Sequence, residues 1–117
     1  MEASLPKSER ICGKTAVAAL FEHGKHAGAG CLNSRYILRE DGECSRILVS
    51  VPKRLFKRAV KRNLLKRRIR ESYRRQKALL GPGVDILFVY TPKEVLPYDT
   101  IYADMTALLS SLSSARV

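Results

Sequence analysis

Residues 57–77, KRAVKRNLLKRRIRESYRRQK, concentrate positive charge on a stretch that otherwise has the composition of a helix. The chain of 117 residues carries a formal net charge of +11. Residues 53–77 hold 13 Lys or Arg side chains against one acid, Glu71, whereas the other 92 residues hold 9 basic and 10 acidic side chains. Because the excess charge is confined to one segment, it indicates a surface that binds a polyanion.

The basic segment predicts a long helix over residues 54–79, ended by Gly81-Pro82-Gly83. At about 100° per residue, one arc carries mostly apolar side chains and is the expected core face. Its members are Leu55, Phe56, Ala59, Val60, Asn63 and Tyr73. The opposite stripe is cationic and comprises Arg54, Lys57, Lys61, Arg68 and Arg75. A third row rises in steps of four residues and should border a partner or a cleft: Arg58, Arg62, Lys66, Arg70 and Arg74.

Three features of this helix favour RNA as the polyanion. A merely solvated helix would mix Glu with Lys at i,i+4, whereas here like-charge pairs each weaken the isolated helix by about 0.2–0.5 kcal/mol. Arginine outnumbers lysine eight to five, which favours forked contacts with phosphate. No heptad pattern follows the basic stretch, so a basic zipper is excluded, and a long helix without helix-turn-helix spacing suits shaped RNA better than duplex DNA. A solvated helix and other nucleic-acid binding remain the alternatives.

The rest of the chain predicts short elements on both sides of the basic helix. A helix is expected over 14–23, and strands over 34–39 and 46–51 should pair as a hairpin. The apolar run 85–90 predicts a central strand covered on both faces. A final helix, capped by Asp99, has an apolar stripe of Ile101, Tyr102, Met105, Leu108, Leu109 and Leu112.

These elements predict one α+β domain over residues 1–117, a two-layer α-β sandwich. The order is α-β-β-α-β-α, with room for one more strand before the long helix. The apolar runs are too short to span a membrane and residues 1–6 do not resemble a signal peptide, so a cytoplasmic protein is expected.

Candidate catalytic and metal-binding groups are few. Three widely spaced cysteines give no disulfide framework, and a set of Cys12, His23, His26 and Cys31 fits no common zinc site. The acidic side chains are scattered, with no pair at helical spacing that would hold two metal ions. The sequence therefore predicts no catalytic residue and no metal site in the protein itself.

The central stretch VPKRLFKRAVKRNLLKRRIRESYR, residues 51–74, resembles the protein component of bacterial ribonuclease P. The resemblance extends upstream through ERICGKTAVAALFEHGK (9–25) and RILVSVPKR (46–54), and downstream through VDILFVYTPKE (84–94). It implies an α-β sandwich with a left-handed crossover around the long helix, against the usual right-handed rule.

The resemblance also implies a subunit of a ribonucleoprotein enzyme. The partner RNA would carry the chemistry with Mg²⁺, bound mainly by that RNA, and would remove the 5′ leader of precursor tRNA. The protein would bind the ribonuclease P RNA and hold the single-stranded leader, and no obligate protein partner is evident. A non-catalytic ribosomal or general RNA-binding protein is the alternative, although such proteins usually spread their charge into tails and loops.

The charge pattern and the resemblance together name the expected contact residues. Those for RNA are Lys53, Arg54, Lys57, Arg58, Lys61, Arg62, Asn63, Lys66, Arg67, Arg68, Arg70 and Arg74, of which Arg62, Asn63, Lys66, Arg67 and Arg70 match the family motif. The leader cleft, between the first helix and the sheet, would contain Val17, Phe21, Tyr36 and Arg39.

Two positions depart from the family pattern, and three residues have structural alternatives. Leu64 replaces the usual arginine after Arg-Asn, a contact that Lys61 or Arg68 would have to supply, and Val17 replaces a common aromatic. Phe21 and Tyr36 are alternatively core residues, and Asn63 a structural amide.

Overall fold

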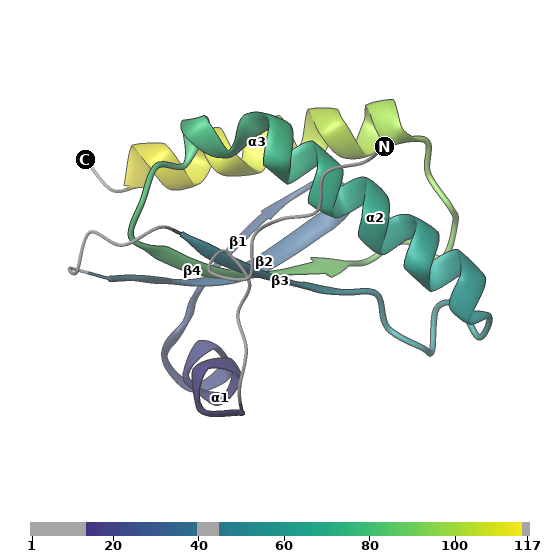
Figure 1. The fold of residues 1–117 in the computed structure, drawn as a ribbon, viewed down its shortest axis with the longest axis horizontal. Coiled ribbons are helices and arrows are strands. Elements are labelled where there is room, and N and C mark those ends of the chain that lie inside the picture. Colours follow the sequence, from purple (N-terminus) through teal and green to yellow (C-terminus); the bar gives the residue numbers. More distant parts are fainter. Residues whose placement is uncertain (1–13, 40–44, 116–117) are drawn as a thin grey trace.

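The computed structural model describes residues 14–39 and 45–115. The elements, drawn in Figure 1, are α1 (Lys14–His23), β1 (Lys25–Ala29), β2 (Leu32–Leu38), β3 (Arg46–Ser50), α2 (Ala59–Gln76), a 3-10 turn η2 (Lys77–Leu79), β4 (Val84–Tyr90) and α3 (Tyr98–Ala115). The helices and strands predicted from the sequence are present, and β1 is the additional strand before the long helix. In the described part of the chain, no helix is both long and apolar enough to cross a membrane.

The four strands form one mixed sheet in the order β1-β2-β4-β3. β4 pairs antiparallel with β2 and parallel with β3, so the predicted hairpin between β2 and β3 is wrong. The reason is that β4 is apolar on both faces and takes the central position between those two strands. The hairpin that does form joins β1 to β2 through Gly30, whose φ of 55° suits glycine. The expected turn at Asp41-Gly42 lies outside the described residues.

Helices cover both faces of the sheet. Figure 1 shows α2 and α3 lying across one face and α1 below the other. The main core lies on the α2–α3 side, where the ring centroids of Tyr73 and Phe88 are 5.9 Å apart. A smaller cluster joins Leu20 of α1 to Leu87 of β4. The two predicted layers are therefore the sheet and the pair of helices α2 and α3. In addition, α1 covers part of the other face of the sheet.

α2 begins at Ala59, five residues later than predicted. Arg58 has extended backbone angles, φ −81° and ψ 125°, and the Leu55 amide closes a turn onto the Pro52 carbonyl at 3.1 Å. Phe56 is buried in this loop, with its ring centroid 6.0 Å from that of Tyr90. The loop is therefore anchored by an aromatic contact instead of by helical hydrogen bonds.

The late start changes which face of α2 is buried. The predicted core face is wrong for Ala59, Val60 and Asn63, which are exposed, Val60 by 78%. The prediction treated Leu55 and Phe56 as core residues of the helix and oriented the helix by them, but both residues lie in the loop before α2. The side chains that α2 buries are Leu65, Ile69, Ser72, Tyr73 and Gln76.

α3 packs beside α2 over the sheet and confirms the predicted stripe, whose members are buried except for half-buried Tyr102. The Gln76 side-chain amide donates to the Ser72 carbonyl at 3.2 Å and to the Tyr102 carbonyl at 3.1 Å. Thr106 in turn donates to the Gln76 side chain. This buried polar link fixes the end of α2 against α3. Asp99 lies in the first turn of α3, two residues inside the N-cap position predicted for it.

Candidate nucleic-acid interface

One exposed flank of α2 carries a row of polar and cationic side chains, which we call the α2 ridge. It comprises Asn63, Lys66, Arg67 and Arg70, spaced i, i+3, i+4 and i+7, so that the four share one face of the helix. Asn63, Arg67 and Arg70 are exposed and Lys66 is half-buried. The buried residues of α2 hold the opposite side against the sheet and α3, so the ridge faces outward.

The single acid of α2 is engaged with two arginines near the end of the helix. Glu71 accepts hydrogen bonds from Arg74 Nε at 3.0 Å and from Arg75 Nε at 3.1 Å. The hydrogen bond from Arg74 is the main reason that the pKa of Glu71 is lowered, so this carboxylate stays charged and engaged with those two arginines. Both of these arginines lie outside the ridge, whose Lys66 and Arg70 place positive charge on the outward flank of α2.

Two of the predicted RNA-binding arginines point into the protein. Arg62 Nη1 donates to the carbonyls of Phe56 and Lys57, at 2.7 and 2.8 Å, and so holds the loop before α2. Arg68 Nη1 donates to the Leu96 carbonyl at 2.6 Å and holds the loop after β4. Both guanidinium groups bind backbone, which sequence reasoning did not anticipate. Of the two neighbours expected to compensate for Leu64, Lys61 is the exposed one.

The remaining predicted cations extend the positive surface beyond the ridge. Lys53 and Arg54 are exposed in the turn before α2, and Lys57, Arg58 and Lys61 are exposed around its first residues. Arg74, predicted with them, is half-buried and engaged with Glu71. The exposed cations therefore run from the turn at Lys53 along α2 to Arg70.

The predicted leader cleft is only partly assembled. Phe21 on α1 is 55% exposed, and Val17 packs against the small cluster between α1 and the sheet. Tyr36, by contrast, is buried in the main core on the opposite face of the sheet. Neighbouring residues of a strand point to opposite faces, so Arg35 and not Tyr36 lies on the α1 side.

Arg35 is a residue of this face that sequence reasoning missed. Its Nη1 donates to the Phe21 carbonyl at 3.0 Å, and its guanidinium carbon lies 5.6 Å from the centroid of the Phe21 ring. This is the geometry of a cation–π contact. The available sequence signal was the alternation of side chains along the strand. Arg35 and Ile37 are two residues apart and share a face, and Ile37 packs toward α1.

A buried carboxylate holds two arginines on the same face of the sheet. Asp85 is 7% exposed and accepts from Arg46 Nε at 2.9 Å and Nη2 at 2.5 Å. Arg39 Nε lies 3.0 Å from Asp85 Oδ1. Two guanidinium groups therefore share this one carboxylate, which fixes the position of Arg39.

No catalytic or metal-binding group stands out in the described residues. Within residues 14–39 and 45–115, no three His, Cys, Asp or Glu side chains gather as metal ligands. Burial, followed by hydrogen bonding to Asp104, raises the pKa of the Cys31 thiol to about 12, so the reactive thiolate is scarce at neutral pH. Cys12, part of the zinc set considered from the sequence, lies outside the described residues.

Comparison with known proteins identifies the family. A family model described as ribonuclease P matches residues 5–113. The ribonuclease P protein component of Chlorobaculum tepidum is 39% identical over an alignment covering 97% of this chain and 86% of that protein. The chain belongs to the bacterial ribonuclease P protein family. It is a protein subunit of ribonuclease P, the holoenzyme that processes precursor tRNA.

Solved ribonuclease P proteins share the fold. The structure from Thermotoga maritima superposes with a TM-score of 0.77 and 25% identity, covering 88% of this chain and 96% of that one. The structure from Staphylococcus aureus gives a TM-score of 0.78 at 23% identity, covering 90% and 95%. The resemblance noted in the basic helix is therefore confirmed over most of the chain.

The inward hydrogen bonds of Arg62 predict a structural effect of its removal. We expect Arg62→Ala to lower the free energy of unfolding by about 1.5–3 kcal/mol, because two carbonyls lose a charged donor. Arg62→Lys keeps the charge, but its amine lies one bond nearer the backbone than Arg62 Nη1, so part of the stability loss should persist. Urea denaturation measures both values, and an Arg62→Ala variant as stable as the unsubstituted chain would contradict the assignment.

Proposed function

We propose that α2 and the turn before it bind the ribonuclease P RNA through phosphate contacts. The observation that carries the proposal is the α2 ridge, whose cations lie on the outward flank of the helix. Forked guanidinium groups bind phosphate oxygens well, and a convex helix with cations at helical spacing suits a structured RNA surface. The exposed cations from Lys53 to Lys61 would extend this contact beyond the start of α2.

The α1 face of the sheet is the proposed site for the 5′ leader of precursor tRNA. Single strands bind through base stacking on aromatic rings combined with a positive groove. Phe21 supplies an exposed ring next to Arg35, and Arg39 and Arg46 add positive charge around Asp85. We propose Arg35 in place of Tyr36 as the contact residue on β2.

The chemistry of leader removal is assigned to the RNA partner. Mg²⁺ would be bound mainly by that RNA, and we propose no protein ligand for it, because the described residues gather no set of carboxylates suited to the ion. The protein's role is then to bind and orient both RNAs, in the cytoplasm where they would meet. We further propose that the connection from β3 through α2 to the parallel strand β4 has the left-handed crossover implied by the family.

The leader site predicts a substrate-specific loss of binding. Phe21→Ala and Arg35→Ala holoenzymes should bind precursor tRNA about 5- to 100-fold more weakly, because one base loses its stacking platform. Affinity for tRNA without a leader should not change. Titration of labelled substrates into holoenzyme in Ca²⁺, with Tyr36→Phe as the control, measures both. An equal loss for both substrates would overturn the assignment.

A further inference from the structure

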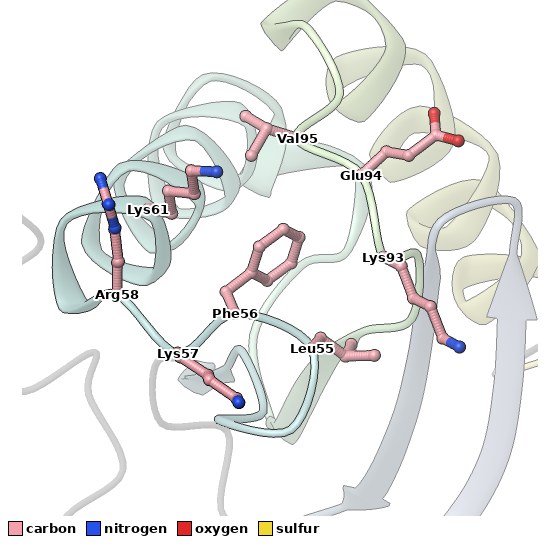
Figure 2. Close-up of a pocket in the computed structure, with 8 residues that line it drawn as sticks. All are labelled: Leu55, Phe56, Lys57, Arg58, Lys61, Lys93, Glu94 and Val95. Carbon is pink, nitrogen blue, oxygen red and sulfur yellow. The ribbon is translucent and has the colours of Figure 1, made fainter.

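A cavity of about 560 Å³ lies at the start of α2. Two segments line it: Leu55 to Arg58 with Lys61 on one side, and Lys93 to Val95 of the loop after β4 on the other. Figure 2 shows the Phe56 ring directed into the space between the two segments. Its volume lies within the range of about 300–1,000 Å³ typical of small-ligand sites.

The walls of this pocket are held in place from inside the protein. Arg62 binds the carbonyls of Phe56 and Lys57 on one wall, and Arg68 binds the Leu96 carbonyl behind the other. The Tyr90 hydroxyl donates to the Glu94 carbonyl at 2.5 Å and accepts from the Leu96 amide at 3.1 Å. A pocket with fixed walls binds its ligand without the entropy cost of ordering loops.

The lining combines an apolar floor with a cationic rim. Phe56, Leu55 and Val95 supply the apolar surface. Four exposed cations surround it, with Glu94 as the single acid: Lys57, Arg58, Lys61 and Lys93. A bare phosphate would not need the apolar floor, and a purely apolar ligand would not need four cations. The lining therefore matches a ligand with a flat ring and an adjacent phosphate.

We propose that this pocket receives one unpaired nucleotide of the RNA bound by α2, with its base against Leu55 and Val95 above the buried Phe56 and its phosphates on the lysine and arginine rim. The proposal rests on the proposed function, because the nucleotide must belong to an RNA already held by the ridge. Bases in RNA loops and bulges are free to leave the stack and enter a protein pocket, whereas a duplex cannot enter a concavity of this size. Lys93, absent from the contact residues predicted from the sequence, becomes one.

Filling the pocket without changing its charge tests the proposal. Val95 is 36% exposed at the pocket, so Val95→Trp should fold normally while blocking entry of a base. We expect its affinity for ribonuclease P RNA to fall about tenfold, the effect of losing one stacked base, with an unchanged salt slope. Lys93→Ala should lower the slope by about one. The matched control is Leu79→Trp, since Leu79 is 44% exposed beyond the far end of α2.

Chemical probing of the RNA identifies the nucleotide. The unsubstituted protein should protect one unpaired base that becomes reactive again with Val95→Trp, while the other protections persist. Equal affinities for the unsubstituted, Val95→Trp and Leu79→Trp proteins, or equal losses in both variants, would overturn the pocket assignment and leave the ridge intact. Failure of the unsubstituted protein to bind the RNA would instead overturn the proposed function of α2.

Discussion

Raising the salt concentration from about 50 to 200 mM should weaken binding of the protein to ribonuclease P RNA by about 10³- to 10⁵-fold, for about six to ten phosphate contacts. The reason is that each neutralised phosphate releases counterions, which high salt opposes. The exposed cations from Lys53 to Arg70 supply enough charges for that number. Fluorescence anisotropy with labelled RNA gives the slope of log affinity against log salt. A flat slope would contradict phosphate-based binding.

The ridge accounts for a defined part of that slope. The double variant Lys66→Ala/Arg70→Ala should lower its magnitude by about two, one for each phosphate contact. Its free energy of unfolding should stay the same or rise slightly, because a repulsive i,i+4 pair is removed. Lys25→Ala, which removes an exposed cation of β1, is the control and should leave the slope unchanged.

The second large effect concerns Asp85, the buried carboxylate on the face of the sheet that α1 covers. Asp85→Ala should lower the free energy of unfolding by about 3–5 kcal/mol, because Arg39 and Arg46 would be left without their buried counter-charge. A loss of this size is a large fraction of the roughly 5–15 kcal/mol that stabilises a typical domain. Urea denaturation followed by circular dichroism measures the loss.

Two further variants separate charge from position in this cluster. Asp85→Asn retains the shape and one acceptor oxygen, so its loss should be smaller than that of Asp85→Ala. Glu22→Ala removes a carboxylate from an exposed side chain and should change stability by no more than about 0.5 kcal/mol. An Asp85→Ala variant within 1 kcal/mol of the unsubstituted chain would show that the two arginines do not depend on this charge.

The sequence was informative wherever a pattern was local and strong. The apolar run of β4 predicted a strand covered on both faces, and the stripe of α3 predicted its buried side. The charge confined to residues 53–77 indicates a surface that binds a polyanion, without reference to any family. Each of these patterns depends on neighbouring residues alone, so it could be read without knowing the sheet order.

Errors arose where distant contacts decided the outcome. A turn signal suggested that β2 and β3 pair, but insertion of β4 between them is a long-range choice. Phe56 is apolar at the right spacing for a helix, yet it packs on Tyr90 in a loop. Tyr36 and Arg35 differ by one position, which is enough to exchange the two faces of the sheet.

The site was harder to predict than the fold, because arginine side chains are long. Arg62, Arg68 and Arg70 look alike in sequence, and each stem can direct its charge toward solvent or back to the protein. The carbonyls that receive Arg62 and Arg68 belong to loops whose positions depend on the folded core. A family motif can therefore contain residues that shape the surface as well as residues that contact RNA.

Reconstituted cleavage tests the role of the α2 ridge most directly. The protein is mixed at low Mg²⁺ with the ribonuclease P RNA of its own source, and cleavage of a precursor tRNA is followed against protein concentration. The unsubstituted protein and Lys25→Ala should stimulate cleavage at the mature 5′ end equally, whereas Lys66→Ala/Arg70→Ala should need a much higher concentration for the same rate. If the ridge variant stimulates cleavage at the same concentration as the unsubstituted protein, the ridge is not the RNA-binding surface.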